Sequence, residues 1–209
     1  MSYHNVLAIP ENVKDFHLEG SGAITFPGGR MRLESLRPSK DGQEANIVLW
    51  CPEDFDGDVT IEWEFWPVNE PGLAIVFFHA RGRQGEDLFN LAPRTGPYEQ
   101  YHHGDLDAHH VSCFRRMWSS ERGSHTCDPR ESHGFHLVAQ EPDPLPAALD
   151  ARGPYDMRLT VAGGETAFSV NGLESSRRRD EHPPPGGKIG FRRMATPIGE
   201  YADLRVTSP

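Results

Sequence analysis

Alternation of apolar and polar residues constrains this chain more than any other feature. Within residues 58–66, every second residue is apolar: Val59, Ile61, Trp63 and Phe65. A period of two puts such residues on one face of a β-strand. No window repeats apolar residues at helical spacing for three turns, whereas short alternating or apolar runs recur between Gly, Pro and Asp. The chain is therefore predicted to be mostly β.

Eleven segments fit a strand, which suits an all-β, two-sheet antiparallel sandwich. They are 22–26, 30–36, 45–50, 58–66, 72–79, 108–116, 134–139, 155–162, 165–170, 187–193 and 201–206. Gly163 and Gly164 predict a tight hairpin between two of them, because a two-residue turn needs positive φ values. Residues 117–132, 140–153 and 175–185 are rich in Pro or charge and are predicted to be loops.

Composition limits the class of protein. A chain of 209 residues with 36% hydrophobic residues can bury a core, and we expect residues 1–209 to form a single domain. The net charge of −10 argues against a nucleic-acid partner. No segment approaches the roughly 18 apolar residues of a membrane helix, and the N-terminus does not resemble a signal peptide. Three cysteines without CxxC spacing predict reduced thiols, so we expect a cytoplasmic protein.

The chemically richest segment is 98–110, which contains four of the eleven histidines. Its side chains can move protons or grip polar ligands. They are Tyr98, Tyr101, His102, His103, Asp105, Asp107, His109 and His110. We interpret the segment as the wall of a functional cleft; the alternative is a polar sheet edge with solvated histidines.

Strand alternation sorts residues 108–116 into two faces. Val111 and Cys113 mark one face as core, and His109 and Arg115 fall with them. The other face is predicted to look into the cleft. It carries His110, Ser112, Phe114 and Arg116.

The strand at 58–66 offers a second candidate surface opposite its apolar face. Glu62 and Glu64 have carboxylates suited to acid, base or hydrogen-bonding roles, and Trp66 has a ring suited to stacking on a sugar. A solvent-facing strand with ordinary charges explains the same pattern.

Metal and nucleotide motifs are weak or missing from the sequence. His103, Asp105 and Asp107 stand two residues apart, which is compatible with a divalent metal, but spacing alone is weak support. No GxSxG, HExxH or phosphate-binding Gly-rich motif occurs, so no cofactor is expected. Arg177, Arg178 and Arg179 are read as a solvated loop, with an anion clamp as the alternative.

Four segments resemble the bacterial YesU-like family: GLAIVFFHARG at 72–82, YEQYHHGDLDAHHVSCFRR at 98–116, GFHLVA at 134–139 and GKIGFRRM at 187–194. The resemblance runs in order across most of the chain. It implies a concanavalin A-like jelly roll, of the lectin, glucanase and galectin type, and a link to bacterial use of plant polysaccharides. His136 and Arg192 lie within these segments. The chain departs from the expected pattern at His109, where we expect a tyrosine-like aromatic, and in the basic segment 177–179.

A weaker similarity links the chain to the 3-keto-glycoside hydrolases, which share the jelly roll and carry a Glu on a strand like 60–66. Tyr98, Glu99 and Gln100 echo their Tyr-Glu-x-Gln segment only loosely. Because one fold hosts many functions, this similarity is an analogy and assigns no activity.

Two main functional classes follow: an enzyme that cleaves an oligosaccharide, and a lectin-like protein that binds one. A third class is a structural role in a larger complex. The imidazoles tilt the prediction toward the enzyme, either a hydrolase or a lyase. The predicted catalytic residues are His110, Tyr101, Asp105, Asp107 and Glu64. The predicted substrate-binding residues are Trp66, Glu62, His102, His103, Ser112, Arg116, His136 and Arg192. In a lyase, Arg116 or Arg192 would neutralise the developing enolate.

Overall fold

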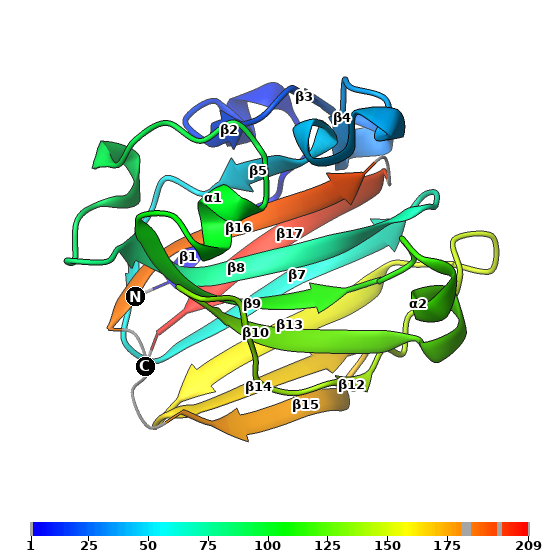
Figure 1. Ribbon diagram of the computed structural model, residues 1–209. Coiled ribbons are helices and arrows are strands. Elements are labelled where there is room, and N and C mark those ends of the chain that lie inside the picture. Colours follow the sequence, from blue (N-terminus) through cyan, green and yellow to red (C-terminus); the bar gives the residue numbers. More distant parts are fainter. Residues whose placement is uncertain (1, 181–184, 196–197, 209) are drawn as a thin grey trace.

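The computed structural model describes residues 2–180, 185–195 and 198–208. Their strands form two antiparallel sheets, which we call sheet A and sheet B (Figure 1). Sheet A has the order β15-β14-β13-β7-β17-β4-β3, with β1 paired to β17. Sheet B has the order β11-β10-β9-β8-β16-β5-β2, with β12 paired to β10 and β6 paired to β16. Among the described residues, no helix is long and apolar enough to cross a membrane.

The bounds of the strands are as follows. Sheet A contains β1 (Ser2–Asn5), β3 (Gly22–Thr25), β4 (Met31–Ser35), β7 (Val59–Pro67), β13 (Tyr155–Ala162), β14 (Glu165–Val170), β15 (Leu173–Arg179) and β17 (Gly199–Thr207). Sheet B contains β2 (His17–Glu19), β5 (Ile47–Trp50), β6 (Phe55–Asp56), β8 (Gly72–Gly82), β9 (Leu106–Cys113), β10 (Thr126–Ser132), β11 (His136–Leu137), β12 (Glu141–Pro142) and β16 (Gly186–Ala195). The helices are short: α1 (Glu99–His102), α2 (Ser119–Ser124), η1 (Pro10–Val13), η2 (Pro27–Gly29), η3 (Ser39–Ala45) and η4 (Leu88–Asn90).

The predicted sandwich is confirmed, and each of the eleven predicted strands overlaps a strand of the structure. The hairpin at Gly163 and Gly164 is also confirmed. Both glycines have positive φ values, +58° and +79°, and Ala162 pairs with Glu165 across the turn. The turn therefore sets the register of β13 against β14.

All three predicted loops contain regular structure, so those predictions were wrong in part. Residues 140–153 contain the short strand β12. Residues 117–132 contain α2 and β10, and residues 175–185 contain most of β15. Both strands consist mainly of polar or charged residues, TCDPRES and LESSRRR, so neither carries the apolar alternation by which a strand is predicted. Pairing with β9 and β14 orders them instead. Residues 181–184, which belong to the predicted loop 175–185, lie outside the described residues.

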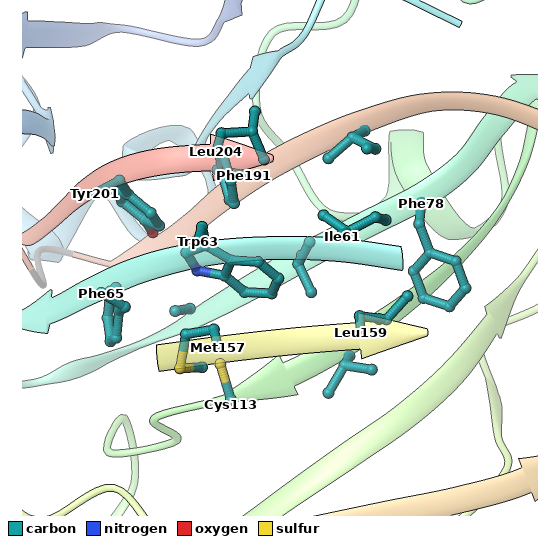
Figure 2. Packing of buried hydrophobic residues seen from close by; sticks show 14 of the residues in the cluster. Ile61, Trp63, Phe65, Phe78, Cys113, Met157, Leu159, Phe191, Tyr201 and Leu204 are labelled. Carbon is teal, nitrogen blue, oxygen red and sulfur yellow. The ribbon is translucent and has the colours of Figure 1, made fainter. Parts of the chain in front are cut away.

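The core lies between the two sheets and is rich in aromatic rings (Figure 2). Sheet A contributes Trp63 and Phe65 from β7, the apolar residues predicted to face inward, and sheet B contributes Phe191 from β16. The rings of Trp63 and Phe191 lie 5.7 Å apart. Burial of such rings dominates the stability of a core of this kind. All three cysteines are buried and free, as predicted.

Sheet B is buried on its outer face as well, the face turned away from sheet A. A second apolar cluster lies there and includes Trp50, Ile75, Phe77 and Met194 from the strands. Residues 83–104 cover it, and in Figure 1 α1 lies in front of β16 and β8. This explains why β8 reads as a nearly continuous apolar run.

Gly190 gives a direct test of this outer packing. A Cβ at Gly190 would lie 2.4 Å from a ring carbon of Trp50. We expect Gly190→Ala to lower the free energy of unfolding by about 1–3 kcal/mol, since overpacking forces the ring to move. Urea denaturation measures the change. Gly123→Ala is the matched control because a Cβ there meets nothing within 4 Å; equal stability of the two variants would contradict the packing described here.

A polar network joins the two sheets at one edge of the sandwich. Arg178 of β15 donates to Glu131 Oε1 at 2.8 Å and to His109 Nδ1 at 3.1 Å. Because a guanidinium only donates, Nδ1 of His109 accepts, and the ring proton is on Nε2, 3.3 Å from Asp180 Oδ2. His109 is therefore held as a neutral imidazole. Burial, followed by the charge of Arg178, lowers the pKa of His109 to about 4.

Stability should fall as the pH drops from about 6.5 to 4. Burial also lowers the pKa of His79 to about 4. In this range the unfolded chain binds protons that the folded chain excludes, so the free energy of unfolding falls by up to about 1.4 kcal/mol per pH unit for each histidine. Above this range the contribution is fully present. We expect His109→Gln to flatten the pH dependence measured by urea denaturation. The exposed His17→Gln is the control, and a slope unchanged in His109→Gln would disprove the assignment.

Candidate functional site

A pocket of about 140 Å³ opens on the outer face of sheet B. Its walls come from β8, β9, β10 and β16 and from the segments that follow or cover them. The lining residues are Gln43, Leu73, Ile75, Tyr98, Ser112, Arg115, Trp118, Arg130, Phe135 and Met194. They combine aromatic rings, two arginines and an apolar floor.

The register of the paired strands brings the residues of the pocket floor next to one another. Ser112 of β9 pairs with Ile75 of β8 on one side and with Asp128 of β10 on the other. Arg192 of β16 pairs with Ile75 in turn. Residues that pair directly across antiparallel strands share a face, so this row runs across the outer face of sheet B. The prediction that His110 and Ser112 share the face opposite Val111 and Cys113 is confirmed.

The segment that carries α1 covers the rest of this outer face. The hydroxyl of Tyr101 donates to Glu19 Oε2 at 2.8 Å, and Tyr101 is fully buried. The guanidinium of Arg192 lies over the rings of both Tyr98 and Tyr101, 4.8 and 4.4 Å from their centroids. Tyr101 and Arg192 therefore fix the covering segment in place and are shielded from a ligand in the pocket.

His110 lies beneath the pocket and contacts one of its walls. Its Nε2 atom is 2.8 Å from the hydroxyl of Tyr98, and its side chain is buried. Burial, followed by the nearby Arg130, lowers the pKa of His110 well below its usual value. Burial raises the pKa of Tyr98 to about 12. The pair is thus a neutral imidazole and a neutral phenol near pH 7.

Aromatic rings form the mouth of the pocket. Trp118 is 52% exposed and Phe135 is 36% exposed, although both are large apolar residues. The guanidinium of Arg130 stacks on the ring of Phe135, 4.0 Å from its centroid. Exposed rings beside forked donors are typical of surfaces that bind a partner or a ligand.

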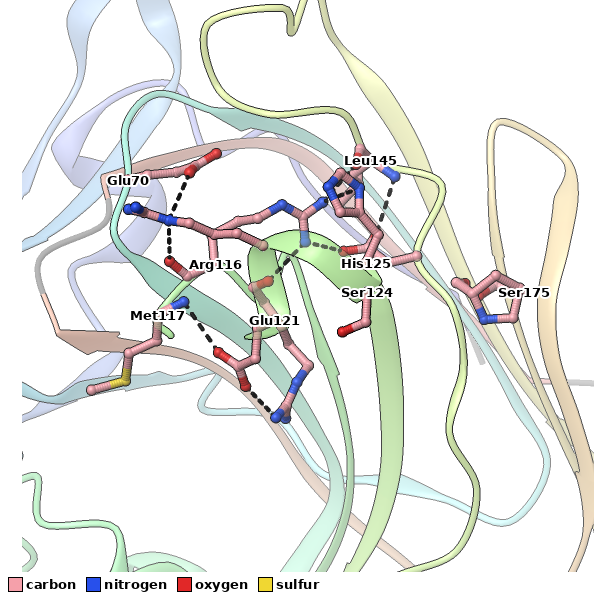
Figure 3. A network of polar contacts seen from close by, with 12 residues as sticks. Glu70, Arg116, Met117, Glu121, Ser124, His125, Leu145 and Ser175 are labelled. Atoms are coloured by element: carbon pink, nitrogen blue, oxygen red, sulfur yellow. Dashed lines mark hydrogen bonds and ion pairs between the residues drawn. The ribbon is translucent and has the colours of Figure 1, made fainter. Parts of the chain in front are cut away.

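The two arginines of the pocket are anchored from behind by buried carboxylates. Asp128 Oδ2 lies 2.9 Å from Nη1 of Arg115 and accepts from Nη2 of Arg130 at 3.3 Å. Arg115 also contacts Glu121, whose other oxygen accepts from the backbone N–H groups of Met117 and Trp118 (Figure 3). Glu121 thus positions the chain that carries Trp118.

Arg116 was predicted to face the cleft, and the structure corrects this. Phe114 has a φ of +49°, so the alternation of β9 ends at Cys113, and Phe114 packs in the core. Arg116 is fully buried, with Nη1 3.1 Å from Asp143 and Nη2 donating to Leu145 O at 2.7 Å (Figure 3). Arg115, which was predicted to face the core, reaches the pocket instead.

Glu62, Glu64 and Trp66 were predicted to line the same cleft, and their position contradicts this. They belong to β7 of sheet A and point away from its core-facing residues, so the whole sandwich separates them from the pocket. Arg30 covers the ring of Trp66 at 4.7 Å. The pKa of Glu64 is raised by partial burial and then by Asp203 and Asp156. The alternation was right, but it did not reveal which sheet β7 joins.

The remaining predicted site residues are not part of the pocket lining. The half-buried His102 packs on Tyr98 and Phe135, both of which line the pocket. His103 contacts His102, and His136 is exposed on β11; neither lines the pocket. Asp105 and Asp107 line a separate hollow with Arg83 and Glu86.

Metal-ligating atoms gather elsewhere in the described part of the chain. Those of His109, Glu131 and Asp180 lie within 4.8 Å of one another, whereas His103, Asp105 and Asp107 form no such group there. Arg178 already places a cation against Glu131 and His109, as described above. The sequence spacing at 103–107 therefore does not converge on a common point.

Several pocket residues were not predicted from the sequence. Trp118 and Phe135 follow strand ends, Gln43 lies in η3, and Arg130 lies on the polar strand β10. None belongs to an alternating pattern. The single signal that the sequence offered was the presence of large aromatic residues in otherwise polar segments.

Comparison with known proteins identifies relatives over the whole chain. The profile of the family described as "Domain of unknown function (DUF1961)" matches residues 1–206. The uncharacterized protein YesU of Bacillus subtilis (strain 168) is 43% identical over 211 residues, covering 98% of this chain and 94% of YesU. A crystal structure of a Bacillus subtilis protein with a galectin-like fold superposes with a TM-score of 0.92 at 43% identity, covering 98% of this chain and 94% of the other.

More distant structures share the fold. A β-glucanase of Bacillus licheniformis has a TM-score of 0.64 at 10% identity and covers 100% of this chain and 98% of its own. The carbohydrate-binding module CBM66 of Bacillus subtilis has a TM-score of 0.58 at 11% identity, covering 92% and 95%. The fold is thus a concanavalin A-like sandwich, as the sequence resemblance implied. With a family profile matched from residue 1 to 206 and 43% identity to YesU, the chain belongs to the DUF1961 family.

Proposed function

We propose that this protein binds a carbohydrate in the pocket on the outer face of sheet B. The observation that carries the proposal is the pocket lining, in which the exposed rings of Trp118 and Phe135 occur together with Arg130, which stacks on Phe135. A sugar presents an apolar C–H face and an edge of oxygens, so it needs an aromatic platform next to planar hydrogen-bond donors.

The size of the pocket favours a short ligand. Pockets for drug-sized molecules are about 300–1,000 Å³. A pocket of about 140 Å³ suits one sugar unit, so the proposed ligand is the end of an oligosaccharide or a single side-branch unit. Structures with the same fold include a β-glucanase and a carbohydrate-binding module, which supports a carbohydrate as the class of ligand. We propose a plant-polysaccharide fragment as its source.

Binding is better supported than hydrolysis. A glycosidase of the common type needs two carboxyl groups on either side of the scissile bond. None of the described residues that line the pocket has a carboxylate, and Asp128 behind it is fully buried between two arginines. Glu64, the carboxylate predicted for this role, lies on sheet A.

A second candidate function is elimination at a uronate, and the contact between Tyr98 and His110 favours it. The phenol lines the pocket, and Nε2 of the neutral imidazole behind it lies 2.8 Å from the phenol oxygen. In this candidate mechanism the imidazole would take the phenol's proton as the phenol oxygen removes one from the sugar. The arginines supply the charge that would stabilise an enolate. A lyase would thus use Tyr98 with His110, and Tyr101 would have a structural role.

Trp118→Ala should weaken sugar binding about tenfold or more, because it removes an exposed platform while leaving the core intact. The measurement is calorimetric titration with rhamnogalacturonan and glucuronide oligosaccharides. Trp66→Ala is the matched control, since that indole lies on sheet A under Arg30. A loss of affinity in Trp66→Ala, with Trp118→Ala unchanged, would move the site to the other sheet.

Tyr98→Phe separates the two candidate functions. The variant keeps the ring and the packing against Arg192 but removes the hydroxyl that contacts His110. If the protein is a lyase, release of the unsaturated product, followed by its absorbance, should slow about 100-fold or more while binding persists. If wild-type protein binds the sugars and releases no product, the function is binding alone.

A further inference from the structure

We infer that the sugar held in this pocket carries a carboxylate, so that the ligand is a uronic acid unit. This inference rests on the proposed function and names the substrate class of the same site. It starts from the charged residues in the described part of the pocket lining, which are Arg115 and Arg130, with no carboxylate among them.

The other hollows of the described surface differ in this respect. The hollow at Asp105 and Asp107 also contains Glu86 and a single arginine, Arg83. The hollow on the outer face of sheet A contains four carboxylates with two arginines: Glu62, Glu64, Asp156, Asp203, Arg158 and Arg205. In a protein of net charge −10, a pocket whose described lining carries two arginines and no carboxylate departs from the overall excess of negative charge.

The buried carboxylates behind the pocket leave some N–H groups of its arginines without a hydrogen-bond partner in the described part of the chain. Within the described residues, Arg130 donates one protein hydrogen bond, from Nη2 to Asp128, out of the five N–H groups of a guanidinium. Asp128 is shared between both arginines, so one negative charge faces two positive charges there. Glu121 balances Arg115 on its other side. Among the described residues, Arg115 thus has two carboxylate partners and Arg130 has one, so Arg130 is the guanidinium with more donors left for a ligand.

Packing fixes the plane of this guanidinium. Arg130 stacks on Phe135 at 4.0 Å, and its side chain is largely shielded from water. A planar fork held in one orientation matches the two oxygens of a carboxylate and loses little entropy on binding. A neutral hydroxymethyl group at the same position of a sugar offers one oxygen and no charge. The arrangement therefore discriminates between a uronic acid and its neutral parent sugar.

The test compares pairs of sugars that differ at one position. Methyl glucuronide and methyl glucoside form one pair, and methyl galacturonide and methyl galactoside form the other. We expect one acid to bind at least tenfold more tightly than its neutral partner in ligand-observed NMR titrations of the wild-type protein. The methyl ester of that acid should behave as the neutral sugar. Raising the salt concentration should weaken binding of the acid and leave the neutral sugar unchanged.

Arg130→Gln should abolish the preference, with the affinity for the acid falling about tenfold and the affinity for the neutral sugar staying within twofold. Arg177→Gln, on the exposed surface of β15, is the control and should leave both affinities unchanged. The paired titrations on wild-type protein need no variant, so they test the inference even if Arg130→Gln does not fold.

Three outcomes would overturn the inference, and they are distinguishable. Equal affinity for the acid and the neutral sugars would show that the pocket does not recognise a carboxylate, while the proposed binding of a carbohydrate would still stand. Tighter binding of glucose 6-sulfate than of either acid would assign the pocket to sulfated sugars. If none of these sugars, nor the oligosaccharides used with Trp118→Ala, binds at all, the proposed function fails and the inference fails with it.

Discussion

The buried carboxylate of Glu19 determines where a ligand can reach sheet B. It accepts hydrogen bonds from Nε1 of Trp50 at 2.9 Å and from the hydroxyl of Tyr101 at 2.8 Å, and it pairs with Arg94 at 2.9 Å. These contacts link β2 and β5 to the segment that carries η4 and α1. A buried charge is tolerated only when it is paired and hydrogen-bonded, so these contacts hold the segment over part of the outer face. The pocket lies beside it, where β8, β9, β10 and β16 supply lining residues.

Charge is arranged in layers around that pocket. The cations Arg115 and Arg130 line it, and the carboxylates Asp128 and Glu121 lie behind them. Because each arginine is oriented by a buried carboxylate, its guanidinium is already held in place before a ligand binds. This is preorganisation, which raises affinity by lowering the entropy lost on binding. It also explains how a protein of net charge −10 presents two arginines to a ligand.

Sequence reasoning was successful where a period of two applies without interruption. The alternation in β7 and the Gly163–Gly164 turn correctly predicted faces and pairing, because a strand has one period and the turn has one geometry. The same reasoning failed at Phe114, where one residue with positive φ exchanges the roles of Arg115 and Arg116. A single backbone angle of this kind leaves no mark in the pattern of residue types. The sequence also did not show which strands belong to which sheet. Glu64 and His110 were therefore assigned to one cleft, although they lie on different sheets.

The histidines illustrate why residue type alone overstates catalysis. An imidazole in solution titrates near pH 6.5, which is the reason for predicting acid–base chemistry at His110. Burial removes that property here, since it lowers the pKa of His110 well below its usual value, and it lowers the pKa of the neighbouring His109 to about 4. The hydroxyl of Tyr98 lies 2.8 Å from Nε2 of this neutral imidazole, within hydrogen-bonding distance. Because Tyr98 is the member of the pair that lines the pocket, a ligand there meets the phenol and not the imidazole.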